Sequence, residues 1–190
     1  MAVKVREPYQ GLSREELLDK VYELAAKFEI NSYACSQCVV AGLHEVLGFD
    51  DILVKAATSN CGGTAFQLVG TCGGLTGGIM VLDYYLGRPL EHMSYKEVIM
   101  HPNIDDLFAA QGVARLLFNK YMDRYGTITC ANIMQQRWGR LYYFEDPDEF
   151  AKFEKAGAHS DPKMAPDIVG TAARFTLEVL LDKGAVEVGK

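Results

Sequence analysis

The sequence predicts an all-α fold, a single-domain multi-helix bundle in which one glycine-rich helix bears a cysteine. Two observations predict it. Apolar residues recur at helical spacing along most of the chain, and capping residues, glycines and prolines separate the segments that carry them. The chain has 190 residues, of which 49% are hydrophobic, so residues 1–190 are expected to share one core as a single domain.

The first two helices are marked at their starts and ends. Ser13 and Glu16 have the spacing of a capping box ahead of an apolar stripe. Asn31 or Ser32 is expected to cap a second helix, which Gly48 ends. The stripe of the first helix consists of Leu17, Val21, Leu24 and Phe28, and that of the second of Cys35, Cys38, Val39, Gly42 and Val46.

Two further helices are expected on either side of a glycine-rich loop. A short helix opens at Asp50 or Asp51, ahead of the loop at 61–63, and Thr71 then caps a helix over 72–86. Glycines spaced four residues apart permit close approach by another backbone or by a cofactor, and tight helix packing is at least as good an explanation for them. These glycines are Gly70, Gly74 and Gly78.

The C-terminal part is expected to add three elements. Thr127 or Thr129 caps a short helix that carries Cys130, and residues 141–161 are expected to be irregular with one helical turn. Pro166 suits the first turn of a last helix. Helical stripes lie before and after this region, at Leu107, Ala110, Ala114, Leu117 and Tyr121, and at Ile168, Ala172, Phe175 and Val179.

Charge and composition argue against several classes of partner. Acidic residues outnumber basic ones by 25 to 19, the formal charge is −6, and Lys and Arg are scattered, so no nucleic-acid surface is expected. Residues 56–82 lack charge, but their seven glycines dilute hydrophobicity, so no membrane span is expected. Residues 1–10 show no apolar run typical of a signal peptide, and a cytoplasmic location is expected.

Five cysteines in such a chain are expected to be thiols or metal ligands rather than structural disulfides. Cys35, Cys72 and Cys130 each fall in the first turn of a different expected helix. Helix N-termini lower the pKa of a thiol and stabilise a thiolate or an anionic cluster, so three converging termini would form a thiolate site. For any one cysteine taken alone, burial as a small apolar residue is the favoured alternative.

Cys35 and Cys38 form a C-x-x-C pair, which serves dithiol chemistry or metal ligation alike. No βαβ context supports a thioredoxin-like site, and Val39 stands where covalent haem attachment needs a histidine, so no covalent haem is expected. His159, in a loop before the last helix, could complete a site formed by three thiolates.

A motif and its flanking segments carry a family resemblance. Cys72-Gly73-Gly74-Leu75-Thr76-Gly77 matches a C-G-A-x-x-G pattern, with a cysteine segment before it at 31–40 and another after it at 118–130. Over about residues 13–182 the chain resembles the C_GCAxxG_C_C family of redox-active proteins, which is related to the non-haem part of split-Soret cytochromes. The resemblance implies an iron or iron–sulfur centre, with a two-iron two-sulfur cluster as one candidate, held by Cys35, Cys72 and Cys130. Gly73, Gly74 and Gly77 would line it.

The chain departs from the family at two positions. Gly74 stands where the motif has alanine, a change that should preserve close packing. Family members carry a fourth cysteine just before the last helix, and here residues 161–166 contain none, with Met164 nearest. A neutral thioether cannot serve as a thiolate ligand, so either the site is altered or Cys38, Cys61 or His159 supplies the fourth ligand.

Three functions therefore stay open. The leading one is an iron or iron–sulfur protein that transfers electrons to or from a protein partner, in which helix N-termini set the reduction potential. The second is a metal-free protein in which Cys35 and Cys38 cycle between dithiol and disulfide. The third is a helical scaffold or binding protein that has lost the metal site. A homodimer would suit the glycine face of the Cys72 helix and the many aromatic residues.

Overall fold

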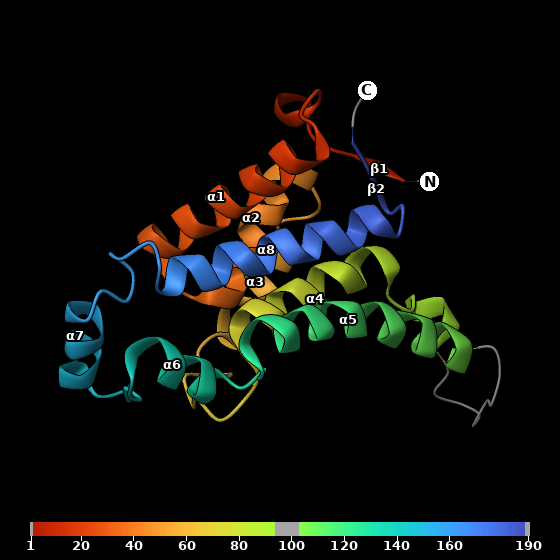
Figure 1. Cartoon of the computed structure of the whole chain (residues 1–190). Coiled ribbons are helices and arrows are strands. Elements are labelled where there is room, and N and C mark those ends of the chain that lie inside the picture. The colour runs from red at the N-terminus through yellow and green to blue at the C-terminus, as the bar shows by residue number, and fades with distance from the viewer. Residues whose placement is uncertain (1, 94–102, 189–190) are drawn as a thin grey trace.

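The computed structural model of the protein describes residues 2–93 and 103–188, and it confirms the all-α fold (Figure 1). Two short strands, β1 (Val3–Lys4) and β2 (Val186–Glu187), pair in parallel and hold the two ends of the described chain together. The α-helices are α1 (Arg14–Ser32), α2 (Cys35–Leu47), α3 (Ile52–Ala56), α4 (Gly73–Leu86), α5 (Asn103–Tyr125), α6 (Cys130–Trp138), α7 (Pro147–Lys155) and α8 (Ala165–Asp182). Short 3₁₀ turns lie at Glu7–Tyr9, Thr58–Asn60 and Leu90–His92.

Helix α8 is the centre of the bundle, because it packs against α1, α2, α4 and α5 (Figure 1). The stripes predicted for α1, α2, α5 and α8 supply part of the core, and full burial of one large apolar side chain stabilises the fold by about 1.5–3 kcal/mol. The fully buried members of these stripes include Leu17, Val21, Val39, Val46, Leu117, Tyr121, Ala172 and Val179. Leu43, Leu75 and Leu177 are buried beside them.

The start of α2 differs from the prediction. The capping box of Ser13 and Glu16 is present on α1, but α1 runs on through Asn31 and Ser32, so neither of these residues caps α2. The chain turns instead at Tyr33 and Ala34, whose φ angles are 59° and 62°. A backbone turn with left-handed residues therefore replaces the expected side-chain cap.

The starts of α4 and α6 are joined by backbone rather than capped by threonine side chains. Thr71 and Thr129 form an antiparallel bridge, and neither threonine makes a capping hydrogen bond. The Cys72 N–H donates to the Ile128 carbonyl at 2.7 Å, and the Cys130 N–H donates to the Gly70 carbonyl at 2.9 Å. This pairing holds two cysteine-bearing helix starts side by side.

The glycines of α4 serve tight packing inside the chain. A Cβ at Gly73 or Gly77 would collide with α2, and one at Gly74 or Gly78 would collide with side chains of α5 and α8. Gly70 precedes the helix and does not share its face. The glycine face is therefore covered by the protein's own helices, which removes it as the surface for the expected homodimer.

Residues 141–161 are more ordered than the sequence analysis expects, because they contain the nine-residue helix α7. Asp146 caps it by accepting hydrogen bonds from the N–H groups of Asp148 and Glu149, and Pro147 occupies the first turn. Helices α6 and α7 lie together at one end of the bundle, at the lower left of Figure 1. They enclose a second, smaller core of Leu68, Met134, Tyr142, Phe153 and Ala158.

No helix within the described ranges is long and apolar enough to cross a membrane.

Candidate functional site

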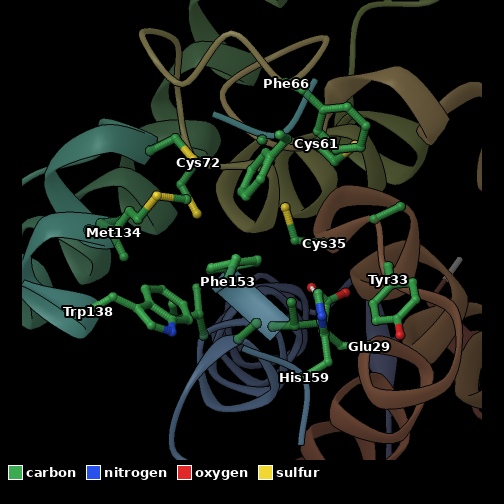
Figure 2. A pocket seen from close by; sticks show the side chains of 18 of the residues that line it. Glu29, Tyr33, Cys35, Cys61, Phe66, Cys72, Met134, Trp138, Phe153 and His159 are labelled. Carbon is green, nitrogen blue, oxygen red and sulfur yellow. Dashed lines mark ion pairs between the residues drawn. The ribbon is translucent and has the colours of Figure 1, made fainter. Parts of the chain in front are cut away.

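A cavity of about 360 Å³ lies where the starts of α2, α4 and α6 meet the end of α1 and the loop before α8. Four of the five cysteines line it, and Figure 2 shows Cys35, Cys61 and Cys72 on one side and Glu29 and His159 on another. Most of the remaining wall is aromatic or aliphatic. The four cysteines are Cys35, Cys61, Cys72 and Cys130.

The structure brings together the three cysteines that the sequence places at helix starts. Cys35 is the first residue of α2, Cys72 is the N-cap residue of α4, and Cys130 is the first residue of α6. Their thiols are close enough to influence one another's ionisation. Close approach of α4 to α2 allows this arrangement, because a Cβ at Gly73 would overlap the Cys35 Sγ atom.

The ionisation of these thiols differs from the sequence expectation. Burial raises the pKa of Cys35, Cys61 and Cys72, and it raises the pKa of Cys130 to about 12. Hydrogen bonds from the N–H groups of Gly74 and Leu75 lower the pKa of Cys72, but by less than burial raises it. The N–H groups at the start of α4 thus act on the Cys72 thiol in the expected direction, but loss of water outweighs them, so the net shift of its pKa is upward.

Cys61 and Cys38 occupy different environments. Cys61 follows the 3₁₀ turn at Thr58–Asn60 and lines the cavity, where its thiol donates to the Thr58 carbonyl at 3.3 Å. Cys38 is buried on α2 and does not line the cavity. Its thiol donates to the Tyr33 carbonyl, and burial followed by the Glu29 charge raises its pKa. Of the two cysteines considered as a fourth ligand, the geometry favours Cys61.

His159 lines the cavity but is already engaged by carboxylates. Its Nδ1 atom lies 2.6 Å from Glu154 Oε1, and its Nε2 atom lies 3.7 Å from Glu29 Oε1. The ring also packs edge-on against Tyr33, with centroids 4.0 Å apart. With a carboxylate near each nitrogen, His159 is poorly placed to be a metal ligand.

Met164, the residue nearest the family's fourth cysteine, is the N-cap residue of α8 and does not line the cavity. The next residue, Ala165, does line it. Met164 therefore does not take the place of the family's fourth cysteine in the cavity wall.

Glu29 and Phe66 are two of the cavity residues that sequence reasoning missed. Glu29 is 3% exposed and continues the buried stripe of α1 at a spacing of four residues after Val21 and Ala25, which is the signal that could have identified it. Phe66 lies in the loop between Cys61 and Cys72, where it and neighbours Thr64, Ala65 and Leu68 have positive φ angles. A tightly wound loop with such backbone angles has no signal in the residue types themselves.

An iron centre fits this cavity in donor type and number, because four thiols and several backbone N–H donors surround one enclosed space. As arranged, no three His, Cys, Asp or Glu residues within 2–93 and 103–188 are grouped closely enough to hold a metal ion. Binding would therefore require the thiol side chains to turn toward a common point.

Comparison with known proteins agrees with the resemblance. The family model described as "Putative redox-active protein (C_GCAxxG_C_C)" matches residues 33–179, a range that contains all five cysteines. No curated protein and no solved structure matches the chain. Because the match covers more than half of the sequence, the chain belongs to the C_GCAxxG_C_C family of redox-active proteins.

Proposed function

We propose that this protein transfers electrons through an iron or iron–sulfur centre held by Cys35, Cys61, Cys72 and Cys130. The observation that carries the proposal is that four thiols from four separate segments line one cavity, three of them at helix starts. Thiolates are the ligands of iron–sulfur clusters, and clusters with four cysteine ligands are the common form. Cys61 thus stands in for the cysteine that the family carries before the last helix.

The protein's own groups would tune such a centre. The N–H groups of Gly74 and Leu75 donate to the Cys72 sulfur, and the Gly62 N–H donates to the Cys35 sulfur. Hydrogen bonds to ligand sulfurs stabilise negative charge and raise the reduction potential, whereas the apolar walls exclude water. The bound group itself would supply a site that gains and loses one electron.

Loading would be coupled to proton release. Burial keeps all four thiols protonated near neutral pH, because the pKa of each is raised. Iron binds the thiolate, so each ligand must lose its proton on binding. Loading is therefore expected to become weaker as the pH falls.

The test is the iron and acid-labile sulfide content per chain after anaerobic purification and reconstitution, together with the visible absorption spectrum. The wild type should contain stoichiometric iron with sulfide. Cys61→Ala should lose both, whereas Cys38→Ala is the matched control and should retain them. Absence of iron and sulfide from the reconstituted wild type would overturn the proposal.

The same samples test the two other functions. In a dithiol protein, mild oxidation would consume the thiols of Cys35 and Cys38 as a pair, and Cys72→Ala and Cys130→Ala would leave that reaction intact. A scaffold would contain no metal and would show no paired thiol loss. The geometry gives the dithiol little support, since the Cys38 thiol is directed to the Tyr33 carbonyl and lies outside the cavity wall.

The proposed role requires an electron-transfer partner, which we propose to be a protein. It also suits a reducing compartment such as the cytoplasm, where free thiols persist.

A further inference from the structure

The part of the cavity next to the cysteines is an aromatic chamber. Rings from five segments form it, and they contact one another edge-on or tilted. Figure 2 shows Trp138 at one side of the cavity and Tyr33 and Phe66 at the other. We define the aromatic chamber by Tyr33, Phe66, Trp138, Phe144, Phe150 and Phe153.

A carboxylate with an unused oxygen lines this chamber. Glu29 is 3% exposed, and its Oε2 atom has no hydrogen-bond partner among the described residues. Its Oε1 atom lies 3.7 Å from His159 Nε2. The Cys38 thiol donates to the Tyr33 carbonyl and lies near enough to the Glu29 carboxylate for that carboxylate to raise the pKa of Cys38. A buried carboxylate oxygen without a donor is costly, so a donor from a ligand would stabilise it.

The charge of the chamber selects the kind of donor. No Lys or Arg is among the residues that line the cavity, where the ionisable groups other than thiols and the Tyr33 hydroxyl are Glu29 and His159. His159 is held by Glu154 as well, so this trio contains two carboxylates and one imidazole. Aromatic faces attract cations through their π electrons, most strongly where water is excluded. Both features favour a positively charged group.

We propose that the aromatic chamber binds a small organic cation, a protonated amine with an aromatic or branched apolar body, whose N–H donates to Glu29 Oε2. The whole cavity, including the side lined by the cysteines, has a volume of about 360 Å³, which is within the ordinary range for small-molecule sites. The proposal needs the shape and charge of the cavity and does not depend on whether iron is bound.

Binding is measured by calorimetry and ligand-observed NMR with three probes of similar shape: phenethylamine, phenethyl alcohol and phenylpropionate. The wild type should bind the amine roughly tenfold more tightly than the neutral alcohol and should not bind the anion, because the charged hydrogen bond is made only by the amine. Equal binding of the amine and the alcohol would overturn the proposal, since it would leave the chamber as an unselective apolar cavity.

Variants locate the interaction. Glu29→Gln should reduce amine affinity roughly tenfold and leave alcohol affinity unchanged, because only the charge is removed. Glu23→Gln, on the same helix with a side chain 63% exposed, is the matched control and should bind like the wild type. If Glu29→Gln does not fold, Phe66→Ala is the second variant, because Phe66 is 43% exposed and its loss should not prevent folding. Phe66→Ala should weaken amine binding, because it removes one ring of the chamber. Unchanged amine affinity in the folded variants would refute the assignment.

The experiment is run on metal-free protein and again on iron-reconstituted protein. Amine binding without iron would support the chamber even if the proposed electron-transfer centre fails. Iron loading without selective amine binding would refute the chamber and leave the centre intact.

Discussion

Replacement of Gly77 by alanine tests the close approach of α4 to α2, on which the position of Cys35 depends. A Cβ at Gly77 would overlap the Ser36 carbonyl oxygen and would lie 3.1 Å from the Ser36 C and Cα atoms. These are backbone atoms, so no side-chain rotation can relieve the contact. Overpacking of this kind costs about 1–3 kcal/mol, and the better helix propensity of alanine offsets at most about 1 kcal/mol. The expected net loss in the free energy of unfolding is therefore up to about 2 kcal/mol, and the loss relative to the control below is about 1–3 kcal/mol.

The matched control is Gly112→Ala in the middle of α5. A Cβ there would have no neighbour within 4 Å, so only the helix propensity changes, and the variant should gain up to about 1 kcal/mol. Urea unfolding followed by circular dichroism measures both variants. Because Ser36 adjoins Cys35, Gly77→Ala should also lower iron incorporation, whereas Gly112→Ala should not. Equal stability of the two variants would refute the reasoning, because it would show that α2 and α4 have room to separate.

Three further predictions follow from particular groups. Burial, together with the charge of Asp167, raises the pKa of Tyr22 from 10.0 to about 12, so the unfolded chain loses this proton first and stability should fall as the pH rises through that interval. Tyr22→Phe should flatten this pH dependence in urea unfolding experiments, and an unchanged slope would assign it to other groups. Burial raises the pKa of Cys130 to about 12, so alkylation of Cys130 in the metal-free protein should be far slower at pH 8 than in the denatured chain and should accelerate with pH. Mass spectrometry of the labelled peptides measures the rate. Equal rates in the folded and the denatured chain would contradict the burial of the Cys130 thiol. Phe153 is 4% exposed and packs against the rings of Trp138 and Tyr142. Phe153→Ala should therefore destabilise the protein by about 3–5 kcal/mol and speed hydrogen exchange in α7. A loss of stability below about 1 kcal/mol would show that the smaller core between α6 and α7 does not unfold cooperatively with the bundle.

The helical elements could be predicted where local signals are strong. The capping box at Ser13, the stop at Gly48 and the proline of α8 all act within one or two turns of the chain, and each has the predicted effect. Helix α7 was missed although Asp146 and Pro147 mark its start, because its nine residues give an apolar stripe only one step long, from Phe150 to Phe153. The caps proposed at Asn31 and Thr71 failed because a neighbouring helix turn or a bridge to a distant segment takes their place.

The candidate site was predictable in part. Helix starts at Cys35, Cys72 and Cys130 are local properties, and they could be read from the sequence before any contact was known. The ionisation of the thiols could not, because it depends on how much water the folded chain removes. The choice of Cys61 over Cys38 also required the structure, since neither the C-x-x-C spacing of Cys38 nor the glycine-rich loop at Cys61 tells which thiol lines the cavity.

By itself the sequence determined the all-α class, the family and the cysteines at three helix starts, because caps, periodicity and motif spacing act over a few neighbouring residues. Only the tertiary structure decided which side chains share the cavity. Glu29 and His159 are 130 positions apart, and Thr71 and Thr129 are 58 apart, yet each pair meets in the fold. These long-range contacts depend on how α1, α4, α6 and α8 pack against one another. The free energy of that packing is shared by the whole core, so no local stretch of sequence encodes the contacts.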